Sequence, residues 1–349
     1  MENGEARSKM ISVPASWDDL LSRLVREREG TVYVGGACDR GKTTLCRYLA
    51  EKLRATAAVA YLDCDTGQST IGPPTTLGCA VHGATEGVFL RFIGSTSPTG
   101  HLLPILAGAK RLQEKAREMG ADVIVIDSPG YIEGGGEELQ IHLIDLLQPD
   151  HVVAIQKEGE FERVLGPFRR TWRMQIHRFT PAPGVRVRSQ DLRRRNREAL
   201  FRNYFIGAEI HEIPLAGIGL HGDVPDALRT GAWQDLLVAV CDGEQFVLAL
   251  GVVQGVDPAQ SAIRILAPAF AGERVASVRV GMKLPSHMRA PLLSGVTLRP
   301  SGESEEQEVD EEGADHNNEC QEYAQHHRSE DRGIFRDCLC RSPHYSRGR

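Results

Sequence analysis

The sequence lacks any apolar run long enough to cross a membrane. No stretch of about 18 uncharged apolar residues occurs among its 349 residues, and Met1–Lys9 lacks the apolar core that a secretory signal needs. Hydrophobic residues at 41% and charged residues at 25% exclude collagen-like and wholly disordered chains. We therefore expect a cytoplasmic protein without a membrane partner, large enough for two domains and a tail.

A cysteine pattern typical of a disulfide framework is also absent. The chain has eight cysteines, and in the cytoplasm we expect them to be reduced thiols. Cys320, Cys338 and Cys340 lie near histidines in the last part of the chain, but their spacing matches no zinc finger or zinc ribbon. We therefore predict a disordered tail there in preference to a metal site.

Short apolar runs alternate with helical patterns in the first half of the chain. Strands are predicted at residues 31–34, 59–62, 122–126 and 151–156, and helices at residues 43–53, 102–118 and 139–147. This alternation predicts an α/β fold with a parallel sheet and helices on both faces.

The second half of the chain changes in composition. Arginines crowd residues 186–202 within a helical pattern over residues 191–205, which puts a local positive charge on a chain of net charge −6. Short predicted strands between residues 236 and 280, two of them joined by Asp242-Gly243, indicate a small β-rich domain. The predicted segments are an N-terminal segment (1–30), a core with the arginine-rich helix (31–210), the β-rich domain (211–300) and a low-complexity acidic and polar tail (301–349).

Residues 36–43 fit the phosphate-binding loop pattern in full, between a predicted strand and a predicted helix. The glycines let backbone N–H groups turn toward phosphate oxygens at the helix N-terminus. Lys42 is expected to reach the β- and γ-phosphates, and the Thr43 hydroxyl to bind Mg²⁺. The loop therefore predicts a P-loop NTPase fold that binds a nucleoside triphosphate with Mg²⁺. The predicted nucleotide-binding residues are Gly36, Ala37, Cys38, Asp39, Arg40, Gly41, Lys42, Thr43 and Thr44.

Three aspartates come at the ends of predicted strands. Asp63 and Asp65 point alike from an extended strand, and Asp127 ends another strand. Because open α/β sheets bind ligands at the carboxyl ends of their strands, we expect all three in one pocket. One carboxylate holds the metal or its water shell, and another contacts an attacking hydroxyl group. The predicted metal-binding residues are Thr43, Asp63, Asp65 and Asp127.

Five segments occur in the same order as in a known family. They are the phosphate-binding loop, Asp65–Gln68, Gly94–Pro98, Pro129–Gly134 and the arginine stretch that ends in Tyr204–Gly207. From about Thr31 to Gly207 the chain resembles the polynucleotide 5′-hydroxyl kinases, which include the kinase subunit of the eukaryotic mRNA cleavage factor and the pre-ribosomal-RNA processing kinase. The eukaryotic relatives carry a folded domain before the kinase core. Only about thirty residues precede the core here, so the chain looks like a compact prokaryotic-style member.

The resemblance implies catalytic roles for particular residues. Asp65 would orient or deprotonate the 5′-hydroxyl group, with Gln68 beside it. Arg193 and Arg197, four residues apart on the predicted helix, match the family's lid arginines and would close over the γ-phosphate. The predicted catalytic residues are Lys42, Asp65, Gln68, Arg193 and Arg197.

The resemblance also implies a substrate-binding group. Gly130 and Tyr131 match the clasp that grips the terminal nucleotide; the family usually has tryptophan where Tyr131 stands, and a tyrosine also stacks on bases. Arg188 matches an arginine just before the lid and is expected to touch substrate phosphates. Asp127 stands where eukaryotic members commonly have asparagine. The predicted substrate-binding residues are Gln68, Pro129, Gly130, Tyr131 and Arg188.

We therefore predict an ATP- and Mg²⁺-dependent kinase that acts on the 5′-hydroxyl ends of RNA or DNA. Two alternatives stay open: an ATP-binding scaffold without kinase activity, and a switch-type P-loop ATPase, because Asp127–Gly130 resembles the Asp-x-x-Gly switch. The absence of an Asn-Lys-x-Asp element disfavours a GTPase. Two residue assignments also stay open. Ser95, Thr96 and Thr99 either cap a helix or bind nucleic acid, and Trp17 either stacks on adenine or packs in the core.

Overall fold

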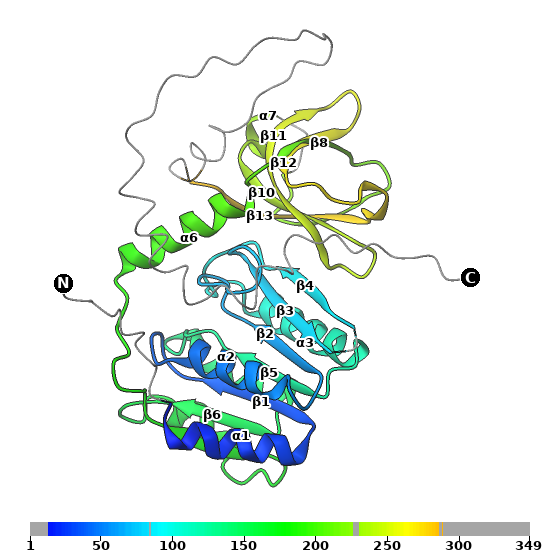
Figure 1. Ribbon diagram of the computed structural model, residues 1–349. Coiled ribbons are helices and arrows are strands. Elements are labelled where there is room, and N and C mark those ends of the chain that lie inside the picture. The colour runs from blue at the N-terminus through cyan, green and yellow to red at the C-terminus, as the bar shows by residue number, and fades with distance from the viewer. Residues whose placement is uncertain (1–12, 84, 226–229, 286–287, 289–349) are drawn as a thin grey trace, which may run out of the picture. The chain divides into compact units, whose positions relative to one another are not determined.

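The computed structural model describes residues 13–83, 85–225, 230–285 and 288. In this part of the chain the first sheet has seven strands in the order β4-β3-β2-β5-β1-β6-β7 (Figure 1). Its strands are β1 (Gly30–Gly35), β2 (Val59–Asp63), β3 (Thr76–His82), β4 (Gly87–Phe92), β5 (Val123–Asp127), β6 (His151–Ile155) and β7 (Gln175–Phe179).

The predicted parallel sheet is confirmed around β1, and one edge of the sheet is antiparallel. Strands β2, β5, β1, β6 and β7 run parallel, whereas β3 pairs antiparallel with both β2 and β4. The reason is the connection from β2 to β3, residues 64–75, which holds no helix to carry the chain back across the sheet. The sheet is therefore mixed, with its parallel part around β1.

Helices cover both faces of this sheet, which confirms the predicted layer arrangement. Helices α1 (Ala15–Glu27) and α2 (Lys42–Leu53) lie on one face, and α3 (Leu102–Glu118) on the other (Figure 1). Helix α4 (Gly135–Leu147) packs beside α3 in the same core. Side chains alternate along β1 as strand geometry requires, so that Tyr33 joins the core under α3 and α4. Trp17 is 3% exposed and packs against Tyr48 of α2, with ring centroids 5.7 Å apart; of its two open assignments, the structure has the core one.

A second, β-rich sheet follows, as predicted. Its order is β8-β12-β11-β10-β13-β9, with antiparallel pairing except for the parallel pair β13 and β9. Its strands are β8 (Glu209–Pro214), β9 (Gly219–Gly222), β10 (Leu236–Cys241), β11 (Val247–Asp257), β12 (Ala262–Ala267) and β13 (Ser277–Lys283), with a short helix α7 (Thr230–Trp233) before β10. The unpredicted strands β8 and β9 are mostly exposed, so they carry little apolar alternation in the sequence.

The arginine-rich helix α6 (Gln190–Tyr204) is anchored on this second sheet at its C-terminal end. Phe201 and Phe205 pack with Leu237 and Leu250, and the backbone N–H of Leu250 donates a 2.8 Å hydrogen bond to the Tyr204 hydroxyl. Helix α5 (Glu162–Leu165) and a 3-10 turn (Gly166–Phe168) precede β7, and a second 3-10 turn (Gly272–Arg274) precedes β13. None of the described helices is long and apolar enough to span a bilayer. The predictions for residues 301–349, including the tail cysteines, lie outside the described residues.

A pair of histidines joins β6, β7 and α1. His151 is 1% exposed, its Nε2 lies 2.7 Å from Glu27 Oε2, and its Nδ1 lies 3.1 Å from His177 Nε2. Burial, followed by the neighbouring His151, lowers the pKa of His177 from 6.5 to about 4. Folding therefore favours the neutral form of His177.

We expect this pair to make folding stability depend on pH. A histidine whose pKa is lowered in the folded state contributes stability that is present above pH 6.5 and is lost as the pH falls toward 4. Chemical denaturation across this range should show a smaller loss of unfolding free energy in His177→Asn than in the wild type. The exposed His142→Asn variant is the control; an unchanged slope in His177→Asn contradicts the assignment.

Candidate active site

An open cavity of about 980 Å³ lies where the sequence predicts the site, at the carboxyl ends of the central parallel strands. It is lined by the phosphate-binding loop after β1, the segments after β2 and β5, and the start of α6. Of the predicted site residues, the cavity brings together Ala37, Cys38, Asp39, Arg40, Gly41, Lys42, Thr43, Thr44, Asp65, Gln68, Asp127, Pro129, Gly130, Tyr131, Arg188, Arg193 and Arg197. Gly36 and Asp63 do not line it.

The phosphate-binding loop depends on Gly36 for its close approach to the sheet. Gly36 has a φ of +145°, and a Cβ atom there would lie 2.3 Å from the carbonyl oxygen of Ile155 in β6. The loop ends at Gly41, which is the N-cap of α2. The Lys42 side chain is 7% exposed, and its Nζ donates a 2.9 Å hydrogen bond to the carbonyl of Ala37 within the loop. The Lys42 ammonium group thus already lies at the loop where the phosphates would bind.

Thr43 and Asp127 form the candidate magnesium pair. Thr43 Oγ1 donates a 2.6 Å hydrogen bond to Asp127 Oδ2, which also accepts one of 3.1 Å from the Tyr61 hydroxyl. Asp127 is 2% exposed; burial raises its pKa, and Lys42 and the Thr43 hydrogen bond oppose this. A hydroxyl oxygen and a carboxylate are oxygen donors of the kind that Mg²⁺ prefers, with water and phosphates completing the shell. No group of three or more His, Cys, Asp or Glu side chains suited to a metal ion occurs among the described residues.

Asp63 and Asp65 take different positions, although the sequence suggests similar ones. Asp63 is 1% exposed; it accepts hydrogen bonds from the Asp65 N–H at 2.9 Å and from the N–H and hydroxyl of Thr70 at 2.5 and 2.8 Å. Burial and the nearby carboxylates of Asp127 and Asp65 raise the pKa of Asp63 to about 7. Asp63 therefore fixes the loop over residues 64–70, and Asp65 is the residue that faces the cavity.

Asp65 presents one oxygen to its own loop and one to the cavity side. Its Oδ1 accepts 2.9 Å hydrogen bonds from the N–H groups of Gly67 and Gln68, while Oδ2 accepts none from the described residues. Gln68 donates from Nε2 to the carbonyl of Arg193 at 3.1 Å. The loop that carries Asp65 is thus joined to the first turn of α6.

A buried glutamine that the sequence analysis missed holds the segment around Gly130. Gln140 of α4 is fully buried, accepts a 2.5 Å hydrogen bond from the Tyr33 hydroxyl and donates one of 2.7 Å to the carbonyl of Pro129. Gly130 then lies directly against the phosphate-binding loop, where its carbonyl accepts a 3.3 Å hydrogen bond from Cys38 Sγ. No local pattern marks Gln140, because its partners are 11 and 107 residues away in the sequence.

The start of α6 is tied to the phosphate-binding loop by Asp39. Its Oδ1 lies 2.9 Å from Arg188 Nε, and its Oδ2 accepts hydrogen bonds from the Arg188 N–H at 3.0 Å and from Arg193 at 2.5 Å. The Asp39 side chain is 2% exposed; burial alone would raise its pKa, but the hydrogen bonds from Arg193 and Arg188 lower it below its usual value. Arg197 lines the cavity one turn further along and forms no ion pair with a described residue.

Other residues at the cavity were only partly foreseen. Thr96, Ser97 and Pro98 line it. Helix α3 begins after His101 without a side-chain cap, so Ser95, Thr96 and Thr99 do not cap it. Residues that the sequence analysis did not assign also line it: Arg47, Thr70, Ser128, Ile132, Glu133, Val185 and Arg186. Spacing alone does not identify these side chains, because most of them lie in loops.

We expect Gly130→Ala to disrupt nucleotide binding. A Cβ atom at Gly130 would lie 2.5 Å from Cys38 Sγ and 2.9 Å from Cys38 Cα, so the phosphate-binding loop must shift. Overpacking of this kind costs about 1–3 kcal/mol, and we expect nucleotide affinity to fall at least about tenfold in a calorimetric titration. Gly166→Ala is the matched control, because nothing lies within 4 Å of a Cβ atom there. Unchanged affinity in Gly130→Ala contradicts this packing.

Comparisons with known proteins follow the same part of the chain. Residues 36–207 match the family model for the mRNA cleavage and polyadenylation factor CLP1 P-loop. A polyribonucleotide 5′-hydroxyl-kinase of Pyrococcus furiosus is 26% identical over 335 residues, which cover 78% of this chain and 93% of the relative. One of Methanocaldococcus jannaschii is 29% identical over 195 residues, and human Clp1 is 28% identical over 204 residues. The chain spans about half the length of these last two relatives, 53% and 46%.

A solved structure extends the likeness to both sheets. Clp1p in its complex with Pcf11p superposes with a TM-score of 0.61 at 15% identity, covering 78% of this chain and 80% of that chain. At this identity the comparison shows the fold alone. The matched segment holds the phosphate-binding loop, Asp65, Gly130 and the arginines of α6, all of which converge on the cavity. Residues 36–207 of this chain thus match the Clp1 P-loop family, and the site residues within them meet in one cavity.

Proposed function

We propose that the protein transfers the γ-phosphoryl group of ATP to the 5′-hydroxyl end of RNA or DNA. The observation that carries the proposal is the meeting of three groups in one cavity: the phosphate-binding loop, a carboxylate and an arginine-bearing helix. These are the parts that phosphoryl transfer requires, because the protein must mainly position the reactants and neutralise charge. Relatives named polyribonucleotide 5′-hydroxyl-kinases support the choice of acceptor.

The triphosphate is bound by the loop over residues 36–44. Backbone N–H groups at the N-terminus of α2 contact its oxygens, and Lys42 exchanges the Ala37 carbonyl for the β- and γ-phosphates. Thr43 and Asp127 are the residues that would hold Mg²⁺, directly or through water. The bound ion would neutralise charge on the β- and γ-phosphate oxygens.

Asp65 acts on the acceptor. With Oδ1 held by two backbone N–H groups, its carboxylate is fixed in orientation and Oδ2 is available to the 5′-hydroxyl group. The 5′-oxygen attacks the γ-phosphorus, the bond from that phosphorus to the bridging oxygen of ADP breaks, and the hydroxyl proton passes to Asp65. Gln68 supports this loop through the Arg193 carbonyl.

The terminal nucleotide is placed by the segment over residues 129–131. Gly130 lies next to Cys38 of the loop, and the half-buried Tyr131 lines the cavity beside it. Tyr131 therefore offers an aromatic ring close to the phosphates, on which a terminal base stacks. The Arg188 side chain pairs with Asp39 of the loop, is 43% exposed, and would contact a substrate phosphate.

The lid arginines Arg193 and Arg197, and Arg188 before them, differ in their ion-pair partners. Arg188 and Arg193 are held by Asp39 beside the loop, whereas Arg197 has no ion-pair partner in the described part of the chain. Arg193 would reach the γ-phosphate by a small movement from Asp39, and Arg197 would neutralise charge on the transferring group. An arginine in this role contributes about 10³- to 10⁵-fold to turnover.

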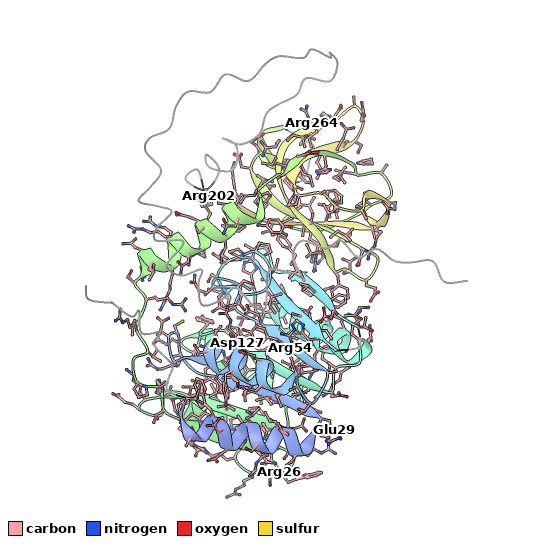
Figure 2. The ribbon with its side chains drawn as sticks, viewed as in Figure 1. Arg26, Glu29, Arg54, Asp127, Arg202 and Arg264 are labelled. Carbon is pink, nitrogen blue, oxygen red and sulfur yellow. The ribbon has the colours of Figure 1, made fainter. Side chains whose placement is uncertain are left out.

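The test is label transfer from γ-labelled ATP to matched RNA and DNA oligonucleotides with 5′-hydroxyl ends. We expect the label on the 5′ end in the wild type and none in Lys42→Ala. Asp65→Asn should lower kcat about 10²- to 10⁴-fold through loss of the base, and Arg197→Ala should lower it about 10³-fold or more. Arg202→Ala is the matched control; Arg202 lies on the same helix and is exposed (Figure 2).

Two results would overturn the proposal. ATP binding that depends on Lys42 without any transfer would indicate the scaffold alternative. Release of free phosphate without labelled oligonucleotide would indicate the switch-type ATPase.

We also expect Asp39→Ala to release the lid from the loop. The variant removes the acceptor of three hydrogen bonds, each with Arg188 or Arg193 as donor, so the segment before α6 loses its anchor. Hydrogen bonds to charged groups contribute about 1.5–3 kcal/mol each. Limited trypsin digestion of the nucleotide-free protein should then cleave after Arg186 and Arg188 at least several times faster than in the wild type.

The control for this prediction is Glu160→Ala. It breaks the 2.7 Å ion pair with Arg40 on the same loop without touching the lid, and should leave the cleavage rate unchanged. Equal cleavage in Asp39→Ala and the wild type contradicts the anchoring role.

A further inference from the structure

One tryptophan stands almost fully in solvent. Trp172 is 85% exposed, whereas Trp17 and Trp233 are 3% and 1% exposed. It lies in the short connection between the 3-10 turn over residues 166–168 and strand β7. A large aromatic side chain left in water forgoes the burial that stabilises most tryptophans, so its exposure points to a ligand.

Arginines surround this tryptophan on both sides in the sequence. The Arg173 guanidinium lies over the Trp172 ring, 4.8 Å from its centroid, which orients the ring and covers one side of it. Arg169 and Arg170 are also exposed; Arg169 lies 3.2 Å from Glu162. Arg170 and Arg173 form no ion pair with a described residue. We call Arg169, Arg170, Trp172 and Arg173 the Trp172 surface.

The Trp172 surface lies apart from the cavity. It precedes β7, which runs parallel to β6 and β1, so it lies at the edge of the sheet where these strands begin. The phosphate-binding loop follows the end of β1, at the opposite edge. None of the four residues lines the cavity. A ligand here would therefore be a second contact, beyond the reach of one terminal nucleotide.

We propose that the Trp172 surface binds single-stranded nucleic acid. A base stacks on the ring face opposite Arg173, and Arg170 and Arg173 contact phosphates of the same strand. A duplex does not fit this chemistry, because its bases are already stacked on one another. An acidic peptide would engage the arginines but leaves the open face of Trp172 without a role.

Intrinsic tryptophan fluorescence tests the proposal directly, since only one of the three tryptophans is exposed. The probe is a 5′-phosphorylated oligouridylate titrated without ATP, so that no phosphoryl transfer takes place. We expect quenching of the wild-type signal, and quenching in Tyr131→Ala to the same extent, because Tyr131 stacks on a base in the other site. Loss of the stacked ring in Trp172→Leu should weaken binding of a labelled oligouridylate between about fivefold and a hundredfold.

The arginines are tested by salt dependence. Each phosphate contact contributes a slope of about −0.7 to log affinity against log salt for single strands. The double variant Arg170→Ala, Arg173→Ala should show a shallower slope than the wild type. Arg264→Ala, an exposed arginine of β12, is the matched control (Figure 2). All three substituted residues are exposed, so thermal unfolding should be unchanged.

Three results would overturn the proposal. One is oligouridylate binding, seen by anisotropy, that leaves the tryptophan fluorescence of the wild type unchanged. Another is equal affinity in Trp172→Leu. A third is quenching by poly-glutamate that matches quenching by oligouridylate, which would reassign the surface to an acidic protein. Because Tyr131→Ala separates the two sites, none of these results bears on the kinase proposal.

Discussion

The ion pairs of Asp39 with Arg188 and Arg193 hold the candidate active site together. They join the phosphate-binding loop to Arg188, just before α6, and to Arg193, within α6. These partners lie 149 and 154 residues further along the chain. The start of α6 lines the cavity with Arg193 and Arg197. The Asp39 carboxylate also neutralises two arginines beside a loop that carries Lys42 and Arg40. The positive charge of these arginines therefore lies next to the phosphate site.

The arrangement of the other site residues depends on two buried carboxylates at the edge of the sheet. Asp63 and Asp127 end the neighbouring strands β2 and β5 and lie directly opposite each other in their register. Each is satisfied differently: Asp63 by the backbone and side chain of its own loop, and Asp127 by Thr43 and Tyr61. This division leaves Asp65 facing the cavity. Two buried carboxylates therefore shape the site, and the half-exposed one is positioned for chemistry.

The sequence was sufficient where function depends on neighbouring residues. The phosphate-binding loop, the helix Leu102–Glu118 and the alternating strands around β1 could all be predicted, because glycine spacing and apolar periodicity are local. The edge strands of the second sheet, β8 and β9, could not be predicted, because their exposed residues show no apolar alternation. The antiparallel direction of β3 was not predicted; it follows from the lack of a helix in the connection over residues 64–75.

The contacts that assemble the site were beyond local reasoning. Three of these contacts join residues at least 11 positions apart in the sequence, and two of them join residues more than 90 apart. They are Gln140 with Pro129, Cys38 with Gly130, and Asp39 with Arg193. The spacing of Asp63 and Asp65 suggested a shared role, and only the hydrogen bonds of Thr70 reveal their difference. Periodicity could not predict which distant segments meet. The family resemblance could, because its five segments belong to one site.

The most direct test of the account is a crystal structure with Mg²⁺, a non-hydrolysable ATP analogue and a dinucleotide that ends in a 5′-hydroxyl group. The account predicts the 5′-oxygen about 3–3.5 Å from the γ-phosphorus and in line with the leaving oxygen. Asp65 Oδ2 should lie within hydrogen-bond distance of that oxygen, and Arg197 should contact the γ-phosphate. A 5′ end bound away from Asp65, or a triphosphate bound with Arg197 still turned from it, would contradict the account.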